Sequence, residues 1–217
     1  MFKDRDHAGC QLAERLLAET LTDPVVFALP RGGVPVALPV ARALGAPLEL
    51  LLVRKLGMPG QSELAAGAVV EGEPLDVVFN DGVLRMGGLT KADFEPAIAE
   101  KKKEIADRRV KYLKGRSRTS AKGRTAVVVD DGVATGATAR AALKGLALQS
   151  PAKIVLALPV GPEDVLRDLE RLVDQVICLE IPEPFYAVGA HYREFRQVSD
   201  DEVVTLMDAY ENERKNK

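Results

Sequence analysis

Cysteine, histidine and tryptophan are scarce in this chain of 217 residues, which holds two cysteines, two histidines and no tryptophan. Cys10 and Cys178 are far apart in apolar segments, which predicts reduced thiols in a cytoplasmic protein and no disulfide framework. The same scarcity argues against zinc or redox-metal chemistry, because such sites need several of these ligands.

Long apolar runs and a strong net charge are absent as well. No stretch approaches the ~20 apolar residues that cross a bilayer, and residues 1–6 lack the apolar core of a secretory signal. A formal net charge of −2 excludes a globally basic nucleic-acid binder. The composition is that of a globular protein, 47% apolar and 29% charged, so we expect one domain over residues 1–217.

Apolar strands alternate with amphipathic helices along most of the chain. Strands are expected at residues 25–29, 48–53, 125–129, 153–158 and 175–181. Helices are expected around Leu12 to Leu17, at 34–44, 91–113 and 137–148, from Pro162, and after a capping box at Ser199 and Glu202. The alternation predicts an α/β fold with a mainly parallel sheet and helices on both faces, whose ligands bind at the carboxyl ends of the strands.

Residues 127–138, Val-Val-Val-Asp-Asp-Gly-Val-Ala-Thr-Gly-Ala-Thr, carry the strongest functional signal. An apolar strand ends there in two carboxylates, and a loop of small residues then opens a helix. Unpaired amides of the first helical turn and the hydroxyls of Thr135 and Thr138 suit a phosphate group. Asp130 and Asp131 would repel that phosphate, so we assign them to the hydroxyls of an attached ribose or to a metal-bound water. The plainer alternative is a turn that needs Gly and Thr, with Asp as a cap.

This segment resembles the 5-phosphoribosyl-1-pyrophosphate (PRPP) signature of type I phosphoribosyltransferases. In that family the acidic pair binds the ribose 2′ and 3′ hydroxyls, which here implies Asp130 and Asp131. The loop of the family holds the 5′-phosphate, and these positions correspond to Ala134, Thr135, Gly136, Ala137 and Thr138. The resemblance covers about residues 1–200 and is closest to small stand-alone bacterial members. It implies transfer of 5-phosphoribose from PRPP to a nitrogenous base with release of pyrophosphate, and Mg²⁺ bridging the pyrophosphate and the ribose hydroxyls.

An upstream segment repeats the strand, loop and helix order. Pro30, Arg31, Gly32 and Gly33 lie between the expected strand 25–29 and the helix that follows. Arg31 offers bidentate donors to a phosphate, and the two glycines allow the backbone to come close. We predict that these four residues bind the pyrophosphate, with Arg31 joining the acidic pair in catalysis. A tight turn with a solvated arginine is the alternative.

Glycine and proline interrupt the pattern between residues 55 and 90, which predicts a mobile loop followed by a short hairpin. In the resembled family a flexible flap at this place excludes water during transfer. Arg54 and Lys55, at its start, are candidates for pyrophosphate contacts, and solvated loop charges explain them equally well. Glu63 is either catalytic or a surface residue.

Residues 184–192, Pro-Phe-Tyr-Ala-Val-Gly-Ala-His-Tyr, resemble the aromatic-x-x-Val-Gly segment of purine phosphoribosyltransferases. In those enzymes an aromatic ring stacks on the base, which implies Phe185 or Tyr186 here, in a small hood built from the N-terminal segment and residues 182–200. An aromatic ring that closes the edge of the core is the alternative. His191 is either a general base or a surface residue.

The identity of the acceptor base cannot be inferred from any one subfamily. Ala134 stands where 6-oxopurine enzymes have an aspartate that acts near N7 of the base, and Gly132 replaces the usual large aliphatic residue. We favour a purine-like acceptor, and PRPP and this base as the partners of a homodimer without membrane contact.

Eleven of the 30 lysines and arginines fall between Lys101 and Arg124. Such a run binds RNA, attracts a polyanionic substrate or forms a solvated helix face. Tyr112 is its only aromatic residue, which argues against nucleic acid. The alternative to an enzyme is a non-catalytic PRPP- or nucleotide-binding regulator that contacts RNA through this run. A receiver-type signalling domain would place its acidic pair much nearer the first strand.

Overall fold

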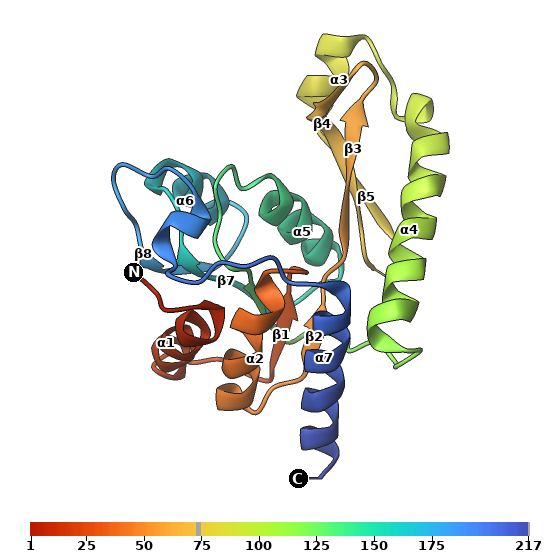
Figure 1. Ribbon diagram of the computed structural model, residues 1–217. Coiled ribbons are helices and arrows are strands. Elements are labelled where there is room, and N and C mark those ends of the chain that lie inside the picture. The colour runs from red at the N-terminus through yellow and green to blue at the C-terminus, as the bar shows by residue number, and fades with distance from the viewer. Residues whose placement is uncertain (73–74, 217) are drawn as a thin grey trace.

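The computed structural model describes residues 1–72 and 75–216, apart from the side chains of Ser62 and Glu63. The question of a catalytic Glu63 therefore lies outside the described residues. A five-stranded parallel sheet with the order β2-β1-β6-β7-β8 forms the centre of the fold (Figure 1). Its strands are β1 Pro24–Ala28, β2 Leu48–Leu50, β6 Thr125–Val129, β7 Lys153–Val160 and β8 Gln175–Glu180.

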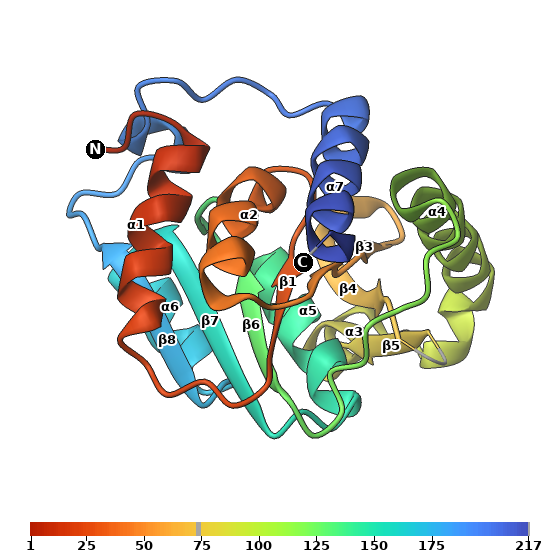
Figure 2. The same cartoon turned by 90° about the horizontal axis from the view of Figure 1, so that it is seen from below.

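Helices cover both faces of this sheet (Figure 2). One face carries α1 Arg5–Leu17, α2 Gly33–Leu44 and α7 Asp200–Lys215, and the other carries α5 Ala137–Leu148 and α6 Glu163–Glu170. Successive residues of the central strands alternate between two apolar cores, since Val127 and Val129 join one core and Ala126 and Val128 join the other. The predicted α/β fold with helices on both faces is thus confirmed. None of the described helices is long and apolar enough to cross a membrane.

The region expected to be a mobile loop and a short hairpin is instead a second, antiparallel sheet. It consists of β3 Val53–Met58, β4 Gln61–Val70 and β5 Asp76–Phe79. After it come α3 Asp81–Gly87, the 3₁₀ turn Lys91–Phe94 and α4 Glu95–Leu113, so the single helix expected at 91–113 is also divided. The strand expected at 48–53 ends at Leu50, and Val53 already belongs to the second sheet.

Helices pack on this antiparallel sheet and bury part of it, α4 against β3 and α5 against β4 and β5 (Figure 1). Gly67 lets β4 and β5 pair closely, since a Cβ atom on it would lie 2.4 Å from the Val78 carbonyl oxygen. Alanine and glycine at such positions weaken the period-2 signal that the sequence pattern depends on.

A buried ionic network joins the two sheets to α4. Glu71, which is 2% exposed, accepts contacts of 2.7 Å from both Arg109 and Arg118, and its second oxygen accepts the Leu52 amide at 3.2 Å. Glu49, which is 4% exposed, accepts the amides of Leu50 and Thr119 at 3.0 and 2.9 Å. Each of the four carboxylate oxygens therefore has a donor, as buried charges require.

The basic run from Lys101 to Arg124 is largely neutralised by ion pairs within the chain. Seven of its cations have carboxylate partners: Lys101, Arg109, Lys111, Lys114, Arg116, Arg118 and Arg124. These pairs reduce the positive charge that RNA would meet and give the run a structural role on α4.

Candidate active site

The two predicted phosphate loops lie next to each other at the carboxyl edge of the parallel sheet. They follow β1 and β6, which are neighbours in the sheet and pair Ala28 with Val129. A Cβ atom on Gly32 would lie 2.0 Å from Asp131 Oδ2, and one on Gly33 would lie 2.7 Å from the Val129 carbonyl oxygen. Glycine is required here because the first loop packs directly on the acidic pair. The Pro30–Arg31 peptide bond is cis.

The acidic pair is partly buried at this edge. The Asp131 amide donates to Asp130 Oδ1 at 2.9 Å, which turns the first carboxylate back onto the loop. Burial raises the pKa of Asp130 well above its usual range, and the neighbouring charge of Asp131 adds to the effect. Burial also raises the pKa of Asp131, and this rise is opposed by the guanidinium of Arg5. Two carboxyl groups so close together are stabilised by a ligand that brings positive charge or hydroxyl donors.

Arg5, which the sequence reasoning missed, is the cationic partner of Asp131. Its Nε and Nη2 atoms each lie 2.8 Å from Asp131 Oδ2, and Nη1 donates to the Arg196 carbonyl oxygen at 2.7 Å. Tyr192 adds a 2.6 Å hydrogen bond from its hydroxyl to the Asp131 carbonyl oxygen. One signal in the sequence could have found Arg5: it falls on the buried stripe of α1 that also holds Ala8 and Leu12.

The 5′-phosphate loop has the accessibility that its predicted role needs. Gly136 is the buried residue before α5, with a φ of +69° that glycine adopts readily, whereas Thr135 and Thr138 are exposed. Both threonines line a cavity of about 310 Å³ between α5 and the antiparallel sheet, and so does Lys55. Lys55 therefore shares a cavity with the loop of residues 134–138, and its predicted contact to pyrophosphate stays a prediction.

Arg31 reaches a charged cluster at the start of α7. Asp200 Oδ1 lies 3.4 Å from Arg31 Nη1 and accepts the Tyr112 hydroxyl at 2.7 Å, and Lys111 Nζ lies 2.8 Å from Asp200 Oδ2. The hydrogen bond from Lys111 and that from Tyr112 lower the pKa of Asp200 to about 2. Lys111 is thus a second cation near Arg31. The sequence suggested only that Lys111 is part of the basic run.

Arg54 lies in a different setting from the one predicted. Its Nε atom is 3.1 Å from Glu104 Oε2 of α4, and its Nη1 atom donates to the Val53 carbonyl oxygen at 2.7 Å. Burial lowers the pKa of Arg54. In this arrangement Arg54 attaches α4 to β3, whereas Arg31 and Lys111 meet at Asp200.

The N-terminal segment and the segment after β8 come together in a hood, where Phe2 and Tyr192 form an isolated parallel β-bridge. Phe185 stacks on His191, with ring centroids 5.5 Å apart and an interplanar angle of 14°. It also lines a cavity of about 450 Å³ beside the start of α6. Tyr186 is 82% exposed. Both predicted base platforms are thus in the hood, one with a ring partner and one open to solvent.

The chain matches a known protein family over most of its length. The family described as phosphoribosyl transferase domain matches residues 4–192. This chain belongs to the phosphoribosyl transferase family. Proteins of that name from two Mycobacterium tuberculosis strains, CDC 1551 / Oshkosh and H37Rv, are 47% identical over 208 residues, covering 96% of this chain and 46% of each relative. The chain therefore spans about half the length of these relatives.

A solved structure extends the match over a whole chain. The crystal structure of TT1426 from Thermus thermophilus is 40% identical, with a TM-score of 0.85, and the match covers 96% of this chain and 98% of that one. The family predicted from residues 127–138 is confirmed, and so is its fold.

Asp130 and Asp131 are two adjacent carboxylates without a third acidic, histidine or cysteine ligand among the described residues. Among the residues that the structure describes, no three His, Cys, Asp or Glu side chains form a metal-binding group. Asp130 and Asp131 each receive a donor on one oxygen, from the Asp131 amide and from Arg5. A divalent cation fits here only if phosphate and hydroxyl oxygens of a substrate supply most of its ligands.

Proposed function

We propose that this chain transfers 5-phosphoribose from PRPP to a nitrogenous base and releases pyrophosphate. The observation that carries the proposal is the packing of the Pro30–Gly33 loop against the acidic pair, with the second proposed anion loop, residues 134–138, on the same sheet edge. A sugar with anionic groups at both ends matches two anion loops that flank two carboxylates. Family membership supports the reaction class.

Each element has a part in the proposed displacement at C1′ of the ribose. The loop amides and Thr135 and Thr138 would hold the 5′-phosphate, and the carboxylates of Asp130 and Asp131 would accept the ribose hydroxyls. As the bond to pyrophosphate breaks, positive charge develops on the ring, and the two carboxylates stabilise it. Arg31 and the backbone of residues 30–33 would bind the departing pyrophosphate.

Mg²⁺ is part of the proposal, with Asp130 and Asp131 as indirect ligands through water or the ribose hydroxyls. When bound, the ion would neutralise charge on the pyrophosphate leaving group. The limited donor set at the acidic pair fits this indirect role, because it leaves most ligand positions to the substrate.

The acceptor is proposed to be purine-like and to bind under the hood. Tyr186 offers an exposed ring for stacking, and Phe185 offers a ring beside a cavity. A homodimer and a cytoplasmic location belong to the same proposal, and light scattering after size-exclusion chromatography tests the first of them.

Pyrophosphate release tests the proposal. The protein is mixed with PRPP, Mg²⁺ and, separately, adenine, guanine, hypoxanthine, xanthine, uracil and orotate. Release with a purine supports the proposal, and release with a pyrimidine alone corrects the acceptor. PRPP binding in calorimetry without release from any base would instead favour the regulator, and absence of PRPP binding would contradict both.

A further inference from the structure

We infer that Arg5 is a positioning residue for Asp131, holding this carboxylate in the orientation that the ribose hydroxyls require; the inference rests on the proposed function. The side chain of Arg5 is 10% exposed and lies 126 positions before its partner in the sequence. Its contacts use Nε, Nη1 and Nη2, so all three nitrogens of the guanidinium are engaged.

The geometry fixes one oxygen and leaves the other for a ligand. Both nitrogens that reach Asp131 contact Oδ2, and Gly32 packs on that same oxygen. Arg5 makes no contact to Oδ1, and the carboxyl group of Asp131 also lies within hydrogen-bonding reach of the Asp130 carboxyl group. The Asp131 carboxylate is thereby held between α1 and residues 30–33, with Oδ2 fixed by Arg5. Positioning residues orient ligand-binding groups in this way.

Several elements hold Arg5 itself in place. Its guanidinium carbon lies 3.8 Å from the centroid of the Phe195 ring, and Phe195 contacts the ring of Tyr192 at 5.0 Å. Tyr192 in turn donates to the Asp131 backbone. Burying a charged arginine is costly unless it is paired, and here its carboxylate partner belongs to the proposed site.

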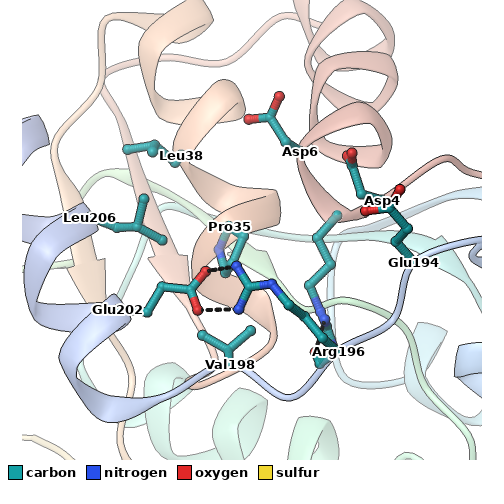
Figure 3. A pocket seen from close by; sticks show the side chains of 10 residues that line it. Asp4, Asp6, Pro35, Leu38, Glu194, Arg196, Val198, Glu202 and Leu206 are labelled. Atoms are coloured by element: carbon teal, nitrogen blue, oxygen red, sulfur yellow. Dashed lines mark hydrogen bonds and ion pairs between the residues drawn. The ribbon is translucent and has the colours of Figure 1, made fainter.

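A cavity of about 280 Å³ lies on the other side of Arg5, between α1, α2 and the hood. Figure 3 shows Asp4, Asp6 and Glu194 around it, and the paired side chains of Arg196 and Glu202 beside them. Arg5 is part of the wall of this cavity, so its truncation would open a path from the acidic rim to Asp131. A free guanidinium ion could enter there and replace the missing group.

The test is chemical rescue of the full chain. Arg5→Ala should raise the KM for PRPP and its dissociation constant roughly 10- to 100-fold, as losses of supporting residues do. Guanidinium chloride, far below denaturing concentrations, should restore most of this loss, while sodium chloride of equal strength should not. Arg15→Ala, on the exposed face of the same helix, is the matched control and should behave like the unmodified protein.

Two results would overturn the inference: an unchanged PRPP affinity in Arg5→Ala, or a loss that guanidinium fails to restore. If Arg5→Ala does not fold, Arg5→Lys decides, because lysine keeps the charge but has one nitrogen in place of the three guanidinium nitrogens that contact Asp131 and the Arg196 carbonyl. A raised KM in the folded Arg5→Lys protein supports the inference, and an unchanged KM contradicts it. If the unmodified protein binds no PRPP, the proposed function fails, whereas equal binding by the variant and the unmodified protein removes only the role of Arg5.

Discussion

Two pairs of acids in this molecule, one buried and one partly buried, differ in how many of their carboxylate oxygens have a donor. Glu49 and Glu71, at the junction of the sheets, have a backbone amide or an arginine on every carboxylate oxygen. Asp130 and Asp131 have such a donor on one oxygen each, and Arg5 is their one cationic partner among the described residues. Fully paired carboxylates hold the fold together, whereas a half-paired set at a sheet edge is prepared for a ligand.

The largest effect is expected when Asp130 and Asp131 are both neutralised, and the contrast between the two pairs fails if PRPP still binds. Asp130→Asn combined with Asp131→Asn should abolish PRPP binding, since both carboxylates are lost and Arg5 then faces a neutral amide at position 131. Calorimetry with PRPP and Mg²⁺ measures this. Asp107→Asn, an exposed position on α4, is the control, and unchanged affinity in the double variant would remove the role of the acidic pair.

The fully paired acids should show the opposite behaviour. Glu71→Ala removes the carboxylate that Arg109 and Arg118 share, so Arg118 loses its partner and Arg109 keeps its 3.5 Å contact to Glu49, which should lower the free energy of unfolding by ~3–5 kcal/mol. Urea denaturation gives the change, with Glu14→Ala on the exposed face of α1 as control. PRPP affinity below the unfolding transition should stay the same, and a selective loss of affinity with normal stability would erase the contrast between the pairs.

Lys111 tests whether cations outside the loops belong to the site. Its ammonium group lies 2.8 Å from Asp200, which also pairs with Arg31 of the pyrophosphate loop. Lys111→Ala should weaken inhibition by pyrophosphate by about fivefold, equivalent to roughly 1 kcal/mol for one charged contact. Lys103→Ala on the same helix is the control, and equal inhibition constants in the two variants would place Lys111 outside the site.

Asp200 sharpens the comparison as an acid that is well paired but partly exposed. Its folded-state pKa of about 2 lies below the ordinary 3.8, so its carboxylate stabilises the fold at higher pH. This contribution, up to ~1 kcal/mol after screening, should be lost as the pH falls from about 4 to 2. Urea midpoints across that range should decline less in Asp200→Asn than in the unmodified protein, and parallel declines would contradict the assignment.

The parts of the site that sequence could predict are contiguous in the chain. Strand, acidic pair and loop follow one another at residues 127–138, and the order at Leu29–Gly33 is similar. Because the two strands pair in parallel, the two loops that follow them lie at the same edge of the sheet. Arg5 and Lys111 were missed because only the folded chain brings residues so far apart together. The antiparallel sheet was missed because small residues such as Gly67 hide its alternation.

The central claim is that Asp130 and Asp131 bind the ribose of PRPP between two anion loops. The most direct test is a crystal structure of the protein with PRPP and Mg²⁺. The account predicts ribose hydroxyls on the two carboxylates, the 5′-phosphate at residues 134–138 and pyrophosphate at residues 30–33. PRPP bound at another surface, or crystals with this edge empty at saturating ligand, would contradict it.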